Sequence, residues 1–175
     1  FKHASELQKK SSLCFSKLLE VIAVNFKNIR IRFTTAKPQD MTDDVLKVMA
    51  KHKNICKHIH LPVQSGSDKI LSLMNRKHTI NEYKELINKI RRIIPNCGIS
   101  HDIITGFPNE SEDDHKLTLE LMNYVKYDFG FMFKYSERPG TLAHKKLDDN
   151  VPDKIKQKRL QEKSLTYNKN LVLII

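Results

Sequence analysis

Helical and strand-like hydrophobic patterns alternate along this chain, and the alternation limits it to the α/β class. Segments with apolar residues at helical spacing separate four strand-like segments: 29–35, 58–63, 99–105 and 129–135. Strands separated by helices pair in parallel through right-handed crossovers. We therefore predict a partial TIM-like (β/α) barrel, with parallel strands inside and helices outside.

Each predicted strand ends in small, polar or turn-forming residues. These ends are Thr34-Thr35, Gln64-Ser65-Gly66, Gly106-Phe107-Pro108 and 136–140. Three helices then begin at good capping residues, namely Ser67, Thr79 and Ser111. Because parallel sheets and barrels hold their active sites at the carboxyl ends of the strands, we expect a ligand site at this edge.

The charge of the chain suggests an anionic partner. Its 31 basic and 20 acidic residues give a net charge of +11, which favours nucleic acid, although lysines spread over solvated faces explain it equally well. No apolar run is long enough to span a membrane, so no membrane partner is expected. The three cysteines, Cys14, Cys56 and Cys97, are far apart, and we expect them to be buried, inert core residues rather than metal ligands.

Both ends of the sequence indicate a fragment. Phe1 is not a methionine, and residues 171–175 end within an apolar run. We expect the chain to continue at both ends.

Four short motifs, in this order, resemble the radical S-adenosylmethionine methylthiotransferases. They are Ile31-Arg32-Phe33-Thr34-Thr35 with Pro38, the segment 58–76, the segment 100–110 and the segment 133–141. The resemblance extends from about Leu18 to Asn168. It implies a radical-SAM barrel, with residues 1–150 as the later part of that barrel and 151–175 as a helix and linker toward a β-rich RNA-binding domain.

Three branches of this family differ in the residues of these motifs. A branch that modifies a ribosomal protein usually has a histidine after the glutamine, where this chain has Ser65-Gly66. Two tRNA-modifying branches share Gln64-Ser65-Gly66, and the segments 60–64 and 135–141 are most similar to the branch that acts on isopentenyladenosine. The resemblance therefore implies methylthiolation of tRNA, at C2 of N6-isopentenyladenosine 37. The alternatives are the branch that acts on threonylcarbamoyladenosine 37 and a non-catalytic basic RNA-binding α/β module. A TIM-like enzyme for a phosphorylated metabolite is a weaker alternative, because no glycine-rich phosphate loop is present.

The resemblance also implies cofactors and partners. These are S-adenosylmethionine, two [4Fe-4S] clusters, the tRNA anticodon stem-loop and an electron donor that reduces the clusters, in the cytoplasm. The cysteine motif C-x-x-x-C-x-x-C that the family uses is absent from this chain, so the chain alone should be inactive and no metal ligand or catalytic residue is assigned in it.

Six residues at the predicted strand ends are candidates to bind S-adenosylmethionine: Gln64, Ser65, Asp102, Ile104, Gly106 and Tyr135. Gln64 and Ser65 could bond its polar groups, or they could simply cap the next helix. Asp102 lies in an apolar strand and needs a partner, which could be the cofactor, the substrate or a buried arginine. Ile104 and Gly106 could line the adenine, and Tyr135 could stack on it.

Substrate contacts are expected from basic side chains. The candidates are Arg76, Arg138, Lys154 and Lys158, with Lys156 and Arg159 on the same predicted helix. A salt bridge for Arg76 and a solvated face for the helix are the alternatives. Phe129, Phe131 and Phe133 are expected to pack in the core, and the histidines on the strands are expected to be buried and hydrogen-bonded.

Overall fold

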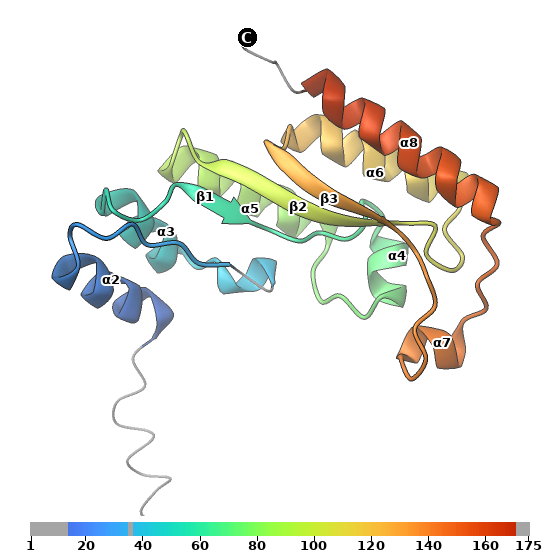
Figure 1. Ribbon diagram of the computed structural model, residues 1–175, viewed down its shortest axis with the longest axis horizontal. Coiled ribbons are helices and arrows are strands. Elements are labelled where there is room, and N and C mark those ends of the chain that lie inside the picture. Colours follow the sequence, from blue (N-terminus) through green and yellow to red (C-terminus); the bar gives the residue numbers. More distant parts are fainter. Residues whose placement is uncertain (1–13, 35–36, 171–175) are drawn as a thin grey trace, which may run out of the picture.

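The computed structural model describes residues 14–34 and 37–170, and side chains as far as residue 166. Helices and strands alternate as predicted (Figure 1). In chain order they are α2 (Phe15–Asn25), η1 (Pro38–Asp40), α3 (Asp43–Lys51), β1 (His58–His60), α4 (Asp68–Leu73), α5 (Ile80–Ile93), β2 (Gly98–Thr105), α6 (Glu112–Val125), β3 (Phe129–Lys134), α7 (Leu142–Lys146) and α8 (Asp153–Asn170).

The three strands form one parallel sheet in the order β1-β2-β3. Ile59 pairs with Ile99, and Asp102 pairs with Phe131. The carboxyl ends of the strands point toward α4 and α7 (Figure 1). The α/β barrel class is therefore confirmed, whereas the predicted strand 29–35 is reduced to one bridge between Ile31 and Ile55. Thr35 lies outside the described residues.

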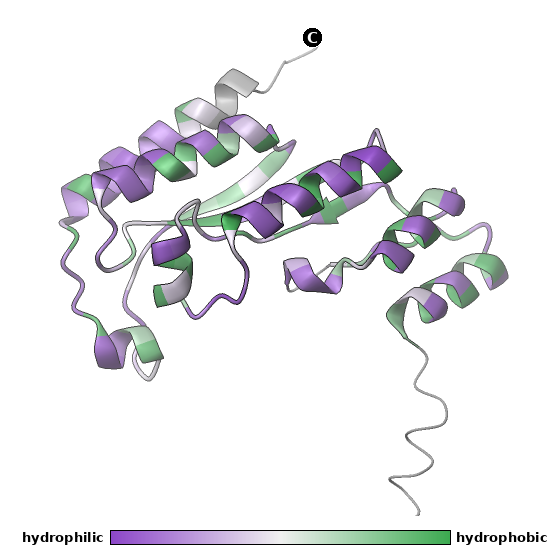
Figure 2. Cartoon of the chain, turned by 180° about the vertical axis from the view of Figure 1, so that it is seen from behind, coloured by the Kyte–Doolittle hydropathy of each residue, from purple (hydrophilic) through white to green (hydrophobic). Residues whose placement is uncertain are grey.

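Helices cover one face of this sheet. Ile99 and Ile103 of β2 join a core with residues of α5 and α6, while α8 packs against β2 and β3. The buried side of α5 is apolar, and seen from behind its outer surface is largely hydrophilic (Figure 2). Burial of such an apolar stripe is the main force that holds a helix on a sheet.

The other face, which we call the open face, carries His58, His60, Ser100, Asp102, Ile104, Phe129, Phe131 and Phe133. The prediction that the three phenylalanines pack in the core is wrong, because they are 38%, 54% and 52% exposed. Their rings contact each other and the histidines of β1 instead. Alternation along β3 predicted a strand, but it could not tell which face of that strand helices would cover.

Predicted capping residues begin three of the helices. Thr79 and Glu82 form a capping box at α5, and Ser111 and Asp114 form one at α6. Ser67 caps α4 through the amide of Ile70. The polar turns therefore fix where each helix leaves the carboxyl edge of the sheet.

The close approach of the 64–66 turn to α6 requires a glycine. A Cβ added at Gly66 would lie 2.5 Å from the Cα atom of Thr118, and the Gly66 amide donates to the Thr118 hydroxyl at 3.0 Å. The turn after β1 is therefore held against the middle of α6.

The cysteines differ in burial. Cys97 is buried, and burial raises the pKa of its thiol to about 11, which suits an inert core residue. Cys14 is exposed, so the prediction of a buried residue is wrong there, and Cys56 is half-buried. Cys14 is the N-cap residue of α2, and the first buried apolar residue of that helix, Leu19, comes more than a turn later.

Candidate functional site

A cleft of about 390 Å³ opens at the carboxyl end of the sheet. Eleven residues line it: Gln64, Asp102, Ile104, Phe107, Phe133, Lys134, Tyr135, Ser136, Arg138, Thr141 and Ala143. Four of the six residues predicted to bind the cofactor are among them, and so is one of the predicted substrate contacts. The strand ends thus meet at one place, as the parallel topology requires.

Gln64 extends the pairing of β1 to the mouth of the cleft. Its amide donates to the Asp102 carbonyl at 2.9 Å, and its carbonyl accepts from the Ile104 amide at 2.9 Å. Its φ of 75° is in the left-handed region, which is costly for a residue with a side chain. The two backbone bonds hold Gln64 in this conformation, so the point from which its side chain enters the cleft is fixed.

Asp102 supplies a carboxylate to the polar side of the cleft. Its Oδ2 atom lies 3.3 Å from Nε2 of His60, and Nδ1 of His60 lies 2.9 Å from the Ser100 hydroxyl. The partner that the sequence required for Asp102 is thus a histidine from the neighbouring strand. The carboxylate is still 26% exposed, so it can accept a further hydrogen bond from a ligand.

The opposite wall of the cleft is apolar and aromatic. Ile104 and Phe133 contribute from the sheet, and Phe107 meets Tyr135 edge to face with ring centroids 5.0 Å apart. The hydroxyl of Tyr135 is buried and has no hydrogen-bond partner among the described residues. Burial, together with the nearby carboxylates of Glu137 and Asp149, raises the pKa of this phenol, so it stays protonated and can donate.

Ser65 and Gly106 lie close to the cleft but do not line it. Ser65 is fully buried, and its hydroxyl accepts from the Ser67 amide at 3.2 Å. Gly106 has a φ of 73°, which favours glycine, and its amide donates to Glu110 at 2.8 Å. Both residues shape the backbone beneath the cleft.

The predicted substrate contacts are spread over three places. Arg138 lines the cleft. Arg76 lines a separate hollow of about 620 Å³ beside Lys37 and Lys77. Lys154 and Lys158 are exposed on α8.

Two further predictions about α8 are wrong. Lys156 and Arg159 are only 4% and 6% exposed and are paired with carboxylates, so neither can follow an RNA backbone. Sequence reasoning also missed Glu110 as the buried partner of Arg159 and Lys163. The spacing 156, 159, 163 places three cations on one face of the helix, and it is the sequence signal that these side chains share a common environment.

The expectation of buried, hydrogen-bonded histidines on the strands is met only in part, because His101 is buried whereas His58 and His60 are half-buried. His60 is hydrogen-bonded, and His58 lies 3.0 Å from Arg32. His101 is fully buried between Tyr127 and Gly130, and neither ring nitrogen has a hydrogen-bond partner among the described residues. Burial lowers the pKa of His101 to about 4, so the ring is neutral.

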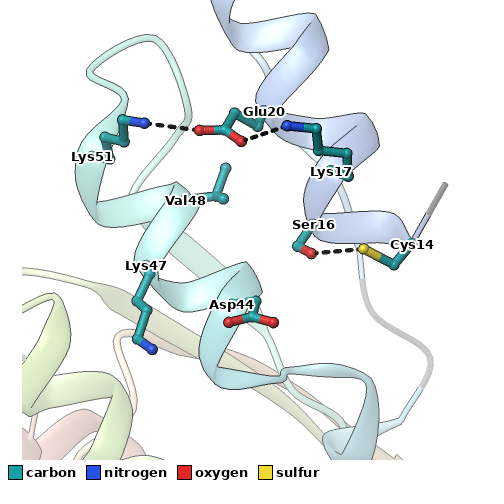
Figure 3. A pocket seen from close by; sticks show the side chains of 8 residues that line it. All are labelled: Cys14, Ser16, Lys17, Glu20, Asp44, Lys47, Val48 and Lys51. Carbon is teal, nitrogen blue, oxygen red and sulfur yellow. Dashed lines mark hydrogen bonds and ion pairs between the residues drawn. The ribbon is translucent and has the colours of Figure 1, made fainter.

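A second hollow lies between α2 and α3, and Figure 3 shows its side chains. Glu20 there is paired with Lys17 and Lys51, at 3.5 Å and 2.8 Å. Cys14 is near the Ser16 hydroxyl, which lowers the pKa of the thiol. These groups bond one another and come from outside the strand ends, so this hollow is not the candidate site.

The described part of the chain offers no group of three or more His, Cys, Asp or Glu side chains that could hold a metal ion. Within residues 14–34 and 37–170, no helix has the length and apolar composition needed to cross a bilayer.

A family model described as the radical SAM superfamily matches residues 5–122. Among curated proteins, the chain is similar to tRNA-2-methylthio-N(6)-dimethylallyladenosine synthases. It is 60% identical to that of Christiangramia forsetii and 62% identical to that of Flavobacterium psychrophilum, over 93% of this chain and 34% of each relative. The synthase of Karelsulcia muelleri is 61% identical over 90% of this chain and 35% of its own length. The chain thus spans about a third of these relatives.

Among solved structures, the chain resembles coproporphyrinogen III oxidase from Escherichia coli, described as a radical SAM enzyme. The TM-score is 0.64 at 23% identity, and the match covers 77% of this chain and 31% of the oxidase. At this sequence identity the similarity supports the fold alone.

Proposed function

This chain belongs to the radical SAM superfamily, and we propose that the whole protein methylthiolates tRNA at C2 of N6-isopentenyladenosine 37. The observation that carries this proposal is the identity of 60% and 62% to relatives named for that product. The cleft at the strand ends supports it, because a ligand site at this edge is what such a barrel requires.

Superfamily membership implies S-adenosylmethionine and an iron–sulfur cluster. When bound together, these cofactors supply the radical chemistry for which the superfamily is named. The groups around the cleft fit S-adenosylmethionine, since an apolar wall faces a carboxylate and an amide. The described residues do not fit a cluster, so we assign no cluster ligand among them. Two [4Fe-4S] clusters and an electron donor that reduces them remain part of the proposal for the whole protein.

Each lining residue has a role in binding under this proposal. Ile104 presents apolar surface to the adenine ring, and Tyr135 packs beside it. Gln64 and Asp102 bond the polar groups of the cofactor, and the fixed backbone of Gln64 reduces the entropy lost on binding. Ser65 and Gly106 contribute through the backbone. These residues bind and orient, and no proton transfer is assigned to them.

The substrate is proposed to be the anticodon stem-loop of tRNA, because its bases and phosphates suit an aromatic cleft with cationic surroundings. Arg138 would contact the nucleotide at the cleft. Arg76, Lys154 and Lys158 would contact backbone phosphates, which favour binding without reading sequence. A tRNA substrate makes the cytoplasm the proposed location.

The test is activity of the full-length protein, loaded anaerobically with iron and sulfide. It would be given tRNA that carries isopentenyladenosine, or in parallel tRNA that carries threonylcarbamoyladenosine, and the nucleosides would be analysed by mass spectrometry. We expect the methylthio product from the first tRNA alone. Product from the second alone would move the protein to the other branch, and no product from either would contradict the proposal.

A matched pair of variants ties the activity to the cleft. Asp102→Asn removes the charge at the cleft and should lower the affinity for S-adenosylmethionine by about 10-fold to 150-fold, since a hydrogen bond to a charged group contributes about 1.5 to 3 kcal/mol. Asp113→Asn makes the same change on α6, where the side chain is 89% exposed, and should leave the affinity unchanged. Equal affinities for the two variants would exclude Asp102 from the cofactor site.

A further inference from the structure

Helix α8 turns three cations inward. Lys156, Arg159 and Lys163 are 4%, 6% and 0% exposed, although a basic helix normally directs such side chains to water. A buried cation is costly unless it is paired and hydrogen-bonded. Each of these three cations is paired with a carboxylate, and the contacts of these cations and carboxylates reach the backbone beside the cleft.

Arg159 and Lys163 meet at Glu110, whose side chain is fully buried. Nη1 of Arg159 lies 3.0 Å from both the backbone oxygen and Oε2 of Glu110. Nζ of Lys163 lies 3.7 Å from the other carboxylate oxygen and donates to the Thr105 hydroxyl at 3.0 Å. Two cations from one helix therefore fix both ends of the segment from Thr105 to Glu110.

The same carboxylate holds the turn between those ends. Oε2 of Glu110 accepts from the Gly106 amide at 2.8 Å, and Gly106 has the left-handed conformation. Phe107, the next residue, lines the cleft. Loss of the cations would leave Glu110 as an unpaired buried charge, which is costly unless water reaches it. A carboxylate that turns toward water would release the Gly106 amide and allow Phe107 to move.

Lys156 reaches the cleft from another direction. Its side chain covers Gly106 so closely that an added Cβ would overlap it. Its Nζ atom lies 2.6 Å from Asp149 and 5.2 Å from the centre of the Tyr135 ring. A cation over the face of a tyrosine attracts the ring and limits its motion.

We propose that Lys156, Arg159 and Lys163 are positioning residues, through which α8 sets the place of Phe107 and Tyr135 in the wall of the cleft. The three cations need not touch the ligand, because they act through Glu110, Gly106 and the aromatic pair. The inference rests on the proposed function only in naming S-adenosylmethionine as the ligand of that wall.

The first measurement is amide hydrogen exchange in the full-length protein and does not depend on any ligand. Arg159→Met and Lys163→Met should each speed exchange at Gly106 and its neighbours at least about tenfold, while β1 and α5 keep their protection. The control is Lys116→Met, which removes an exposed lysine from α6 and should change neither region. Unchanged exchange at residues 105–110 in both variants would overturn the inference. A loss of protection over the whole protein would also overturn it, because the cations would then hold the fold rather than the wall.

The second measurement is the affinity of the same proteins for S-adenosylmethionine, with tRNA affinity measured beside it. Displacement of the wall should weaken cofactor binding about tenfold or more, since small misplacements are costly, and should leave tRNA affinity unchanged. Lys156→Met should behave in the same way, and Lys156→Arg, which keeps the cation over Tyr135, should restore most of the affinity. Wild-type cofactor affinity in all three Met variants would overturn the inference. Failure of the unmutated protein to bind the cofactor would instead count against the proposed function, and hydrogen exchange would still decide the positioning role.

Discussion

The two faces of the sheet are built from the same strands but have different properties. On the helix-covered face, Ile99 and Ile103 are at most 1% exposed in a continuous apolar core. On the open face, Phe131 and Phe133 are more than half exposed beside His60 and Asp102. Adjacent residues of one strand therefore serve different purposes. One set stabilises the fold, and the other leads to a ligand cleft.

The largest expected effect comes from two neighbouring isoleucines on β2. Ile103→Ala should cost about 2 to 5 kcal/mol of stability, because it leaves a cavity in the closed core. Ile104→Ala, on the open face, should cost about 1 kcal/mol, because that side chain is only partly buried. Native-state hydrogen exchange of the β2 amides measures both. Similar losses for the two variants would remove the distinction between the faces.

A pH effect should follow from His101 on the covered face. Its pKa falls from 6.5 to about 4 on folding, so the unfolded state binds the proton first as the pH decreases. Stability from this residue is complete above pH 6.5 and is lost between pH 6.5 and 4, by up to about 3 kcal/mol. Exchange of the β2 amides over this range, compared between His101→Gln and the exposed-site control His144→Gln, measures it. The same pH dependence in both variants would mean that other groups cause it.

A smaller effect is expected at the start of α5, which covers the sheet. Thr79→Ala removes the side chain that accepts from the Glu82 amide and should cost about 1 kcal/mol. Thermal unfolding of the full-length protein, with Thr79→Ser as the matched variant that keeps the hydroxyl, measures this. If the serine variant were as unstable as the alanine variant, the cap would not be the cause.

The smallest effect on stability should come from the open face itself. Phe131→Ala should change the free energy of unfolding by about 0.5 to 1 kcal/mol or less. The reason is that the ring is 54% exposed and packs on other partly exposed rings of the open face, such as that of Phe133. Native-state hydrogen exchange, as used for the two isoleucine variants, measures this change in stability. A loss as large as that of Ile103→Ala would show that something covers this ring in the whole protein.

Sequence patterns predicted the covered face well and the open face poorly. Capping boxes at Thr79 and Ser111 and the apolar stripe of α5 depend on local chemistry, and both are confirmed. The polar ends after β1, β2 and β3 predicted where the cleft lies, because parallel topology brings such ends together. The spacing of Lys156 and Arg159 places them on one face of α8, but neither their burial nor the exposure of Phe131 follows from local pattern, because both depend on which distant segment packs on that side.

The roles expected for Ser65 and Gly106 show the same limit. A small polar residue at a strand end can bond a ligand or shape the backbone, and only the fold separates these possibilities. Here Thr118 and Lys156, both far along the chain, occupy the space beside this turn and this glycine.

The central claim is that the cleft at the carboxyl end of β1, β2 and β3 binds S-adenosylmethionine. A crystal structure of the full-length protein with the bound cofactor tests it most directly. We predict that the adenosine lies against Ile104 and Tyr135 and that the polar groups of the cofactor lie at Gln64 and Asp102. An adenosine bound elsewhere, with this cleft closed or filled by another part of the protein, would contradict it.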